Sequence, residues 1–402
     1  MIVNNRDKDL YNELLSESPK PFYPSTMFDV SFSDSIDVWF GSKLRKDKKS
    51  RMEQLVNCIF ARFSNHKGLF TVALATKHYE KNRYSIEGFS YRTVKPVLEQ
   101  LAELNIIDLY VGFTDFDYPK KHIPSMMRMT DYGYQIMKES GLTVDKLASV
   151  PSELIHVHLP MYFSFEYSPP RAKAEYKDTE RTNALRAEMK FLNEKLKSFQ
   201  LTLEGESVPC LDLYRVFHDE KCNEWGRLEG SFYKEMKKED RSRLKIDGED
   251  AVELDIKSCG LRVLANIAGN PLTDIKDAYS HGELSSFDRE SIKKIILTLI
   301  NRPEKETFPV EVRKQFEGVK FNELKKLVFS YYPFIENNKV DVIRIESDLM
   351  VATAMKCLQE GVAFYPLYDS FLVKRAEKEV VEAVFQDKSI GFTGYGLGLS
   401  EI

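Results

Sequence analysis

Three short segments in the second half of the chain constrain its fold more than any other feature. They are Ala251–Asn266, Arg289–Arg302 and Phe364–Val373, in that order. In the first, apolar residues alternate with acidic ones up to Asp255, which is the period-two pattern of a half-buried strand. The second has helical periodicity, and the third has apolar runs on both sides of Asp369, as in a tight hairpin. We therefore expect an α+β fold that brings two carboxylates together on neighbouring strands.

Two carboxylates held in this way can support phosphoryl transfer. They can share two Mg²⁺ ions about 3.5–4 Å apart, which clamp the attacking and leaving oxygens. We predict Asp255 and Asp369 as catalytic metal ligands, with Mn²⁺ as an alternative ion. Arg289 and Lys293 lie one helical turn apart and are predicted to bind the nucleotide triphosphate, with Lys293 also protonating the leaving group. The alternative for this pair is a solvated helix face. Glu253 is expected to support a nearby Arg or Lys.

In their order and residue types, these segments resemble the motifs of family A DNA polymerases and the related single-subunit phage-type RNA polymerases. Asp255 and the Leu-Arg-Val-Leu-Ala of 261–265 resemble motif A. Arg289 and Lys293 fit the Arg-x3-Lys pattern of motif B. Residues 368–371 read Tyr-Asp-Ser-Phe, where motif C of the RNA polymerases has His-Asp-Ser-Phe.

The resemblance extends over about residues 155–402 and implies template-directed nucleotidyl transfer to a primer 3′-hydroxyl. The stretch Trp225–Ala265 also looks like a group of short polymerases from bacterial mobile elements and phages, some of which act as primase-polymerases with a small partner. The implied partners are a DNA primer-template, dNTPs or NTPs, a small accessory protein and a helicase. The resemblance implies that Arg227, in a Gly-Arg-Leu segment, contacts primer and template, and we add Arg262, Tyr368 and Glu346 as candidate primer- or template-binding residues. The alternative for Glu346 is a structural role, which is common for a carboxylate at the start of a helix.

Two positions depart from the DNA polymerase pattern. Where those enzymes carry a glutamate that helps to block a ribose 2′-hydroxyl, this chain has Gly260, as the RNA polymerases do. The motif B tyrosine position is Asn301, followed by Arg302. We count Gly260 and Asn301 as nucleotide-binding positions and predict measurable ribonucleotide incorporation. The alternative for Gly260 is a tight helix contact without influence on the sugar.

The first third of the chain lies outside the resemblance and has the pattern of a winged helix. Amphipathic helices are predicted over 51–63 and 90–104, and two β-like runs over 106–113 and 123–130. In a DNA-binding winged helix, one helix enters the major groove and the wing meets phosphate. The candidate contacts are Tyr91, Arg92 and Lys95 on the helix and Lys120 and Lys121 at the wing tip. The alternative is a module that binds protein or is only structural, because fold does not fix function.

Three further stretches each allow two interpretations. Residues 42–51 are rich in Lys and Arg and form either a phosphate-contacting arm or a solvated linker. A long helix over 179–203 has the sequence position of a polymerase thumb, with a scaffold helix as the alternative. Residues 234–243 mix cations with acidic residues, which favours a solvated helix face.

We expect an N-terminal winged-helix-like domain for DNA binding or docking over 1–150. A thumb-like helical region follows over 151–224, and a palm with fingers over 225–402, with no room for an exonuclease domain. The net charge of −4 is compatible with a local basic groove. No apolar run approaches the length of a membrane span, and the N-terminus lacks a signal-peptide pattern, so we expect a cytoplasmic protein with no membrane partner.

Two other functions are compatible with the sequence. Gly260 and the Tyr-Asp-Ser-Phe motif favour a DNA-directed RNA polymerase or an RNA-primer synthase. A non-catalytic DNA-binding replication protein with a polymerase relic is the rival from another class. A relic has no reason to keep two aspartates and two cations in one motif order, which argues against it.

Overall fold

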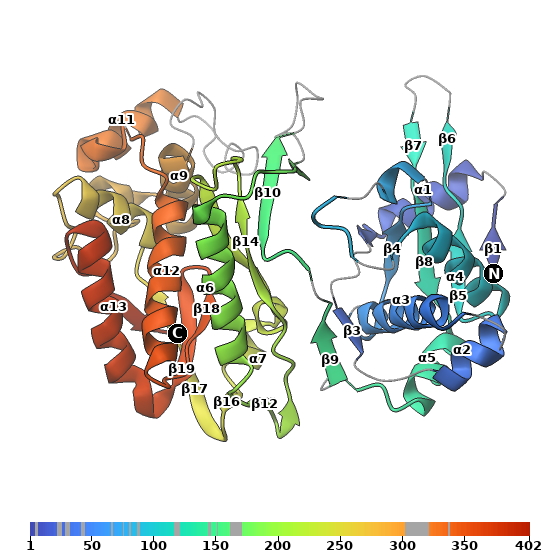
Figure 1. The fold of residues 1–402 in the computed structure, drawn as a ribbon. Coiled ribbons are helices and arrows are strands. Elements are labelled where there is room, and N and C mark those ends of the chain that lie inside the picture. Colours follow the sequence, from blue (N-terminus) through green and yellow to red (C-terminus); the bar gives the residue numbers. More distant parts are fainter. Residues whose placement is uncertain are drawn as a thin grey trace. The chain divides into compact units, whose positions relative to one another are not determined.

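The computed structural model describes residues 1–4, 7–21, 26–28, 33–41, 45–65, 67–74, 76–79, 82–86, 89–115, 121–143, 146–150, 152–160, 171–301, 321–336 and 338–402. The chain forms two compact units, Met1–Glu153 with Glu206–Asp212, and Leu154–Gly205 with Leu213–Ile402 (Figure 1). Both units combine helices and sheets, so the expected α+β class is confirmed. No helix within the described ranges is both long enough and apolar enough to span a bilayer.

The first unit is built on a five-stranded sheet in the order β1-β5-β8-β4-β2, beside the pairs β3–β9 and β6–β7. Its centre is the antiparallel β5–β8 pair, in which Ile107 lies opposite Met129. The strands are β1 Ile2–Val3, β2 Lys20–Pro21, β3 Thr26–Phe28, β4 Leu69–Val72, β5 Ile107–Tyr110, β6 Phe113–Asp115, β7 Lys121–Ile123, β8 Ser125–Met129 and β9 Leu147–Ser149. The helices are α1 Lys8–Ser16, α2 Ser33–Phe40, α3 Lys46–Asn65, α4 Tyr91–Glu103 and α5 Asp131–Glu139.

Two helices, α3 and α4, precede the β5–β8 hairpin in the order expected from the sequence. The linker interpretation is wrong for residues 46–51, because α3 begins at Lys46; residues 42–44 lie outside the described residues. Lys49 of α3 pairs with Asp37 of α2 at 2.5 Å. At the start of α4, Ser90 has the extended backbone of an N-cap, but its hydroxyl contacts Thr93 Oγ1 at 3.2 Å and caps no backbone amide. The DNA-binding role of this arrangement stays a prediction.

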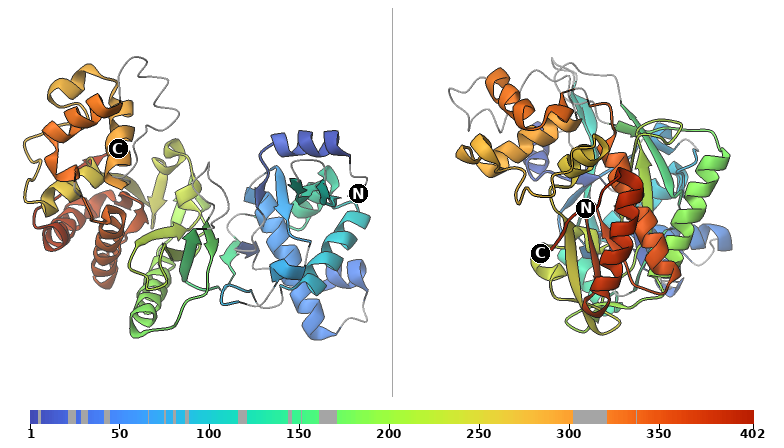
Figure 2. Two further views of the ribbon diagram at one scale, coloured as in Figure 1. Left: turned by 90° about the horizontal axis from the view of Figure 1, so that it is seen from above. Right: turned by 90° about the vertical axis from the view of Figure 1, so that its left-hand side faces the viewer.

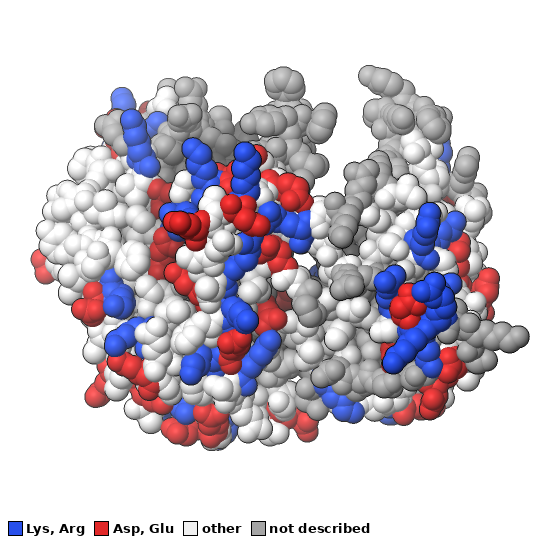
Figure 3. Space-filling view, in the orientation of Figure 1, with Lys and Arg blue, Asp and Glu red and all other residues white. Residues whose placement is uncertain are grey.

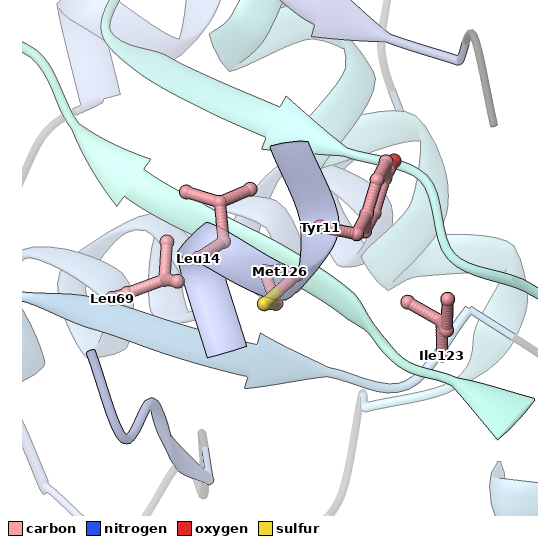
Figure 4. Close-up of a cluster of buried hydrophobic side chains, with 5 residues drawn as sticks. All are labelled: Tyr11, Leu14, Leu69, Ile123 and Met126. Carbon is pink, nitrogen blue, oxygen red and sulfur yellow. The ribbon is translucent and has the colours of Figure 1, made fainter. Parts of the chain in front are cut away.

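Helix α1 closes one side of the first unit's core. Figure 4 shows its Tyr11 and Leu14 against Leu69 of β4, Ile123 of β7 and Met126 of β8, all of them buried. The Tyr11 hydroxyl donates to the carbonyl of Val111 at 2.6 Å, so its polar end is satisfied while its ring is buried. Together with the parallel pairs β1–β5 and β2–β4, this contact attaches the first 21 residues to the rest of the unit.

The second unit contains a sheet in the order β12-β16-β17-β19-β18, with β20 beside β17, and a four-stranded sheet in the order β11-β10-β14-β15. Its strands are β10 Ile155–Pro160, β11 Arg171–Lys173, β12 Leu201–Leu203, β14 Leu213–Phe217, β15 Trp225–Gly230, β16 Leu244–Ile246, β17 Glu249–Ile256, β18 Tyr365–Leu367, β19 Ser370–Lys374 and β20 Leu399–Glu401. The short strand β13 Glu206–Ser207 belongs to the segment Glu206–Asp212 of the first unit. The helices are α6 Glu180–Leu196, α7 Lys238–Arg241, α8 Cys259–Ile267, α9 Arg289–Asn301, α11 Phe321–Tyr331, α12 Val342–Gln359 and α13 Lys378–Thr393.

The two faces of the β17–β19 pair have different surroundings: one packs on helices, and the other carries Asp255. Leu254 of β17 lies opposite Phe371 of β19, and the Phe371 ring packs on Phe385 of α13 with centroids 5.7 Å apart. Figures 1 and 2 show α6, α12 and α13 running side by side, with α12 between the other two. Because strand side chains alternate, Asp255 and Ser370 point to the opposite face, away from this helical layer.

Helix α6 begins and ends for identifiable reasons. A capping box starts it, in which Thr179 accepts from the amide of Thr182 at 3.2 Å and the Thr182 hydroxyl accepts in return at 2.8 Å. The helix predicted over 179–203 ends at Leu196, because Leu201–Leu203 pairs with β16 instead. Its outer face carries mixed charges, as Figure 3 shows, and it contacts β14 and α12 within the second unit.

Candidate active site

Asp255 and Asp369 come together as the sequence predicted. Asp255 lies near the end of β17, opposite Ser370 of β19. The amide of Ile256 donates to the carbonyl of Asp369 at 3.0 Å, which joins the strand end to the β18–β19 turn. The apolar residues on both strands are buried, so the carboxylates project from a rigid, well-packed pair of strands.

The surroundings of Asp255 disfavour its charged form. Burial and the neighbouring Asp369 carboxylate raise the pKa of Asp255 to about 6, while the ammonium groups of Lys293 and Lys238 oppose this shift. A divalent cation bound beside two neighbouring carboxylates would favour their charged forms. Among the described residues, no group of three or more His, Cys, Asp or Glu side chains forms a complete metal site. Two carboxylates suit Mg²⁺, which usually completes its ligand set with substrate phosphates and water.

The helix α9 carries the three predicted nucleotide-binding side chains. Asp288 caps its start by accepting from the Ser291 amide at 2.9 Å. Lys293 is partly buried and close enough to Asp255 to lower its pKa. Arg289 is exposed and pairs with Asp277 at 2.6 Å and with Glu290 at 2.8 Å. Asn301 is exposed, and its amide donates to Leu297 in the same helix.

Gly260 on α8 faces the same helix. A methyl group built at this position would meet Leu297 of α9 at 3.5 Å and Val342 of α12 at 3.6 Å, which are ordinary contact distances. The packing therefore has room for alanine, and sterics alone do not demand glycine here. Any side chain longer than alanine would have to find space beside these two neighbours. The role of Gly260 in sugar selection stays a prediction.

Around Tyr368, three elements of the second unit meet. Tyr368 precedes Asp369 in the β18–β19 turn and has a left-handed backbone, with φ of +47°. The guanidinium of Arg227 in β15 lies 4.2 Å from the centroid of its ring. The ammonium of Lys234, in the short 3₁₀ helix η3 (Tyr233–Glu235), lies 4.0 Å from the same centroid. The structure thus brings Arg227 and Tyr368 together beside Asp369 and adds Lys234, which the sequence did not single out.

Glu346 is buried at the start of α12, beside the same group. Its carboxylate lies 3.8 Å from Arg227 Nη2 and accepts a weak hydrogen bond from the Cys259 thiol at 3.6 Å. Burial, together with the charges of Asp369 and Asp255, raises its pKa to about 7, and Arg227 opposes that shift. Among the described residues, neither Glu346 Oε1 nor Arg227 Nε has a hydrogen-bond partner, although both are buried.

A buried network fixes the backbone that carries Arg227. Arg215 of β14 donates to the carbonyl of Gly226 at 2.8 Å and to Asp348 of α12 at 2.6 Å. Trp225 and Gly226 both have left-handed backbones, with φ of +73° and +65°. A methyl group on Gly226 would lie 2.6 Å from the Arg215 guanidinium, so the close approach requires glycine.

Glu253 and Arg262 have structural roles. Glu253 pairs with Arg241 of α7 at 2.9 Å, as expected of a supporting residue, and accepts from the Ser370 hydroxyl at 2.8 Å. Arg262 of α8 was predicted to contact primer or template. Its guanidinium is buried and donates to the carbonyls of Leu272 and Ile275 in the loop that follows. A contact of Arg262 with DNA therefore has no support in this structure.

In the first unit, the predicted contact residues are only partly described. Arg92 is exposed on α4, and Lys95 pairs with Glu99 one turn later at 3.7 Å. Lys120 lies outside the described residues, as does the side chain of Lys121. Figure 3 shows basic side chains gathered over α3 and α4, with acidic ones at the margins. This surface is compatible with phosphate binding and does not distinguish it from a charged protein interface.

Comparisons with known proteins give distant structural likenesses and no sequence match. No protein-family model matches the chain. No curated protein sequence matches it. Among solved structures, the chain is similar to the POL domain of Pol1 from M. smegmatis in complex with DNA primer-template and dNTP, with a TM-score of 0.31 and 11% sequence identity. The match covers 55% of this chain and 50% of that chain. A likeness at this level does not establish function, which must be argued from the site itself.

Proposed function

We propose that this protein is a template-directed nucleotidyltransferase, a family A-like DNA polymerase that extends a primer 3′-hydroxyl with two Mg²⁺ ions. One observation carries the proposal. Asp255 and Asp369 come from distant parts of the sequence and meet at the end of one strand pair, where burial and the Asp369 carboxylate raise the pKa of Asp255. A bound divalent cation would offset the cost of holding these two carboxylates close together.

The chain's own residues would divide the reaction between them. Asp255 and Asp369 would hold the ions, which when bound supply charge neutralisation at the reacting phosphate and lower the pKa of the primer hydroxyl. Lys293, near Asp255, would bind the triphosphate and protonate the departing pyrophosphate. Arg289 would exchange its Asp277 partner for a phosphate of the incoming nucleotide.

The substrates and setting belong to the same proposal. The template is DNA, and both dNTPs and NTPs are used, since Gly260 presents no side chain toward α9. The role is priming or short-patch replication for a mobile element in the cytoplasm, with a small accessory protein and a helicase. The first unit binds DNA or docks a partner through the basic surface over α3 and α4.

A second candidate is a DNA-directed RNA polymerase or RNA-primer synthase. The space at Gly260 is the observation that favours it, because a ribose 2′-hydroxyl needs room that a longer side chain would remove. The two candidates share the metal site and differ only in the preferred sugar.

Extension of a labelled primer on a DNA template tests the proposal, with Mg²⁺ and with dNTPs or NTPs in separate reactions. Wild-type protein should extend the primer, while Asp255→Ala and Asp369→Ala should reduce the rate at least about 1,000-fold. Asp250→Ala is the matched control, because Asp250 lies on the same strand with an exposed carboxylate paired to Lys245. Equal activity in all four proteins would contradict the two-aspartate site. If the wild-type protein extends the primer neither with dNTPs nor with NTPs, a non-catalytic DNA-binding protein is favoured.

A further inference from the structure

Lys234 occupies an unusual position for a lysine. Its ammonium lies over the Tyr368 ring and donates to the carbonyl of Leu228 in β15. Among the described residues, no carboxylate oxygen lies within 4 Å of it. Burial lowers the pKa of Lys234 to about 8, and the Arg227 charge adds to this, while Glu229 and Glu346 oppose it. A desolvated cation without an ion-pair partner costs folding free energy that a bound anion would offset.

The platform under this lysine is fixed before any ligand binds. A left-handed backbone is uncommon for a bulky residue, and Tyr368 adopts it directly before Asp369. The Tyr368 hydroxyl donates to Glu229 of β15 at 3.2 Å, which sets the ring's orientation. Arg227 and Lys234 both rest on this ring. Two cations and an aromatic ring are therefore held together at the side of one candidate metal ligand.

We propose that Lys234 binds the phosphate of the primer's 3′-terminal nucleotide, with the Tyr368 ring and the Leu228 carbonyl holding its ammonium in place. The inference rests on the proposed function, because Asp369 fixes where the primer 3′-hydroxyl lies. The next anion along the strand from that hydroxyl is the phosphate of the same nucleotide. The incoming triphosphate has its own cations on α9, so it does not need Lys234. An ammonium is a point charge that recognises phosphate without reading sequence, as a primer contact must.

Binding measurements separate this contact from catalysis. The proteins are wild type, Lys234→Met, Lys234→Arg and the control Lys356→Met, whose lysine is exposed at the far end of α12 and paired with Glu360. Each is titrated, without dNTP, onto two labelled primer-templates. One is natural, and the other carries a neutral methylphosphonate in place of the primer-terminal phosphate. Affinity is followed by fluorescence anisotropy over a series of salt concentrations.

On the natural primer, Lys234→Met should bind about tenfold more weakly than wild type. Its slope of log affinity against log salt should fall by about one. On the methylphosphonate primer, wild type and Lys234→Met should bind equally, because the partner charge is already gone. Lys234→Arg should keep most of the affinity, and Lys356→Met all of it. Lys234→Met should melt at or above the wild-type temperature, since it removes a desolvated charge.

Several results would overturn the inference. If the effects of Lys234→Met and the methylphosphonate multiply, the lysine contacts a different group. If Lys234→Met melts at a lower temperature and binds both primers equally poorly, its role is structural. If wild type extends primers but shows no coupling between the lysine and this phosphate, the inference fails and the polymerase stands. If Lys234 and the primer-terminal phosphate are coupled but wild type does not extend primers, the contact is supported and the polymerase is contradicted. If wild type does not bind primer-template at all, both are contradicted.

Discussion

Two sets of cations flank the candidate metal ligands, and the protein holds them differently. On α9, Arg289 is exposed and lies between two carboxylates, Asp277 and Glu290. Around Tyr368, Arg227 and Lys234 are partly buried and rest on an aromatic ring. Exposed ion pairs exchange partners at little cost, whereas buried cations stay where the fold puts them.

The difference fits two kinds of anion. A nucleotide arrives and pyrophosphate leaves in every cycle, so its binding groups must release readily. A primer strand stays through many cycles and must be held in one register. In the proposed reaction, the exposed Arg289 on α9 would therefore serve the nucleotide, and the fixed cations near Tyr368 would serve the primer.

Lys293 is the proposed proton donor on α9, and its neighbour Lys294 allows that role to be tested against a matched lysine. Lys293→Ala should lower kcat about 100-fold, because it removes the proton donor to the leaving group. Lys294→Ala is the matched control and should leave kcat unchanged, since Lys294 is exposed on another face of the helix. Single-turnover extension at saturating dNTP measures both. Equal losses in the two variants would show that α9 acts only through its general charge.

Substitution of Glu346 measures the free-energy cost of burying charged groups near Tyr368. Its pKa in the folded protein, about 7, is above the ordinary value, so its contribution to stability is full below about pH 4.5 and lost as the pH rises through 7. Glu346→Gln should therefore be more stable than wild type at pH 8, by about 2 kcal/mol, with the difference vanishing at pH 4.5. Urea unfolding at both pH values measures it. The control Glu360→Gln, at the exposed end of α12, should show no such pH dependence. A destabilised Glu346→Gln at pH 8 would mean that its ion pair with Arg227 dominates.

Arg227 and Arg289 should affect different substrates. Arg227→Ala is expected to raise the KM for primer-template about tenfold with little effect on the KM for dNTP. Arg289→Ala should do the reverse. Steady-state kinetics with each substrate varied in turn gives both constants. If both variants raise the same KM, the assignment of the two cation sets to two substrates is wrong.

Asp277 should restrain Arg289 only weakly. Asp277→Asn removes one carboxylate from the exposed pair, which should lower the KM for dNTP about threefold, as surface ion pairs are worth less than 1 kcal/mol. Asp274→Asn is a control in the same loop. A rise in KM for Asp277→Asn would indicate that the carboxylate positions Arg289 for the nucleotide rather than competing with it.

The fold around the aspartates could be predicted because local pattern and tertiary structure agree there. Alternation along β17 marks the buried face, and helical spacing marks the buried side of α9. Ile292, Ile295, Ile296 and Leu299 are all buried, as their spacing indicates. Where tertiary pairing opposes local pattern, prediction fails. The helix expected over 179–203 stops at Leu196, because Leu201–Leu203 is needed as a partner for β16.

Lys234 and Arg262 show why the contacts of individual side chains could not be predicted from the sequence. The segment 234–243 contains five cations, and nothing in its linear order indicates which of them meets Tyr368, a residue 134 positions beyond Lys234. Arg262 belongs to the motif that resembles family A, yet its donors bind loop carbonyls about a dozen residues away. A motif identifies a residue type at an offset, whereas its contacts depend on long-range packing.

If Asp255 and Asp369 bind catalytic metal ions as a pair, loss of either carboxylate should remove bound metal. Electron paramagnetic resonance can count the Mn²⁺ ions that bind to a complex of the protein with a dideoxy-terminated primer-template and the next dNTP. Wild type should bind two ions per complex, and Asp255→Asn and Asp369→Asn should each lose at least one of them, while Asp250→Asn keeps both. Unchanged binding in the two aspartate variants would contradict the account.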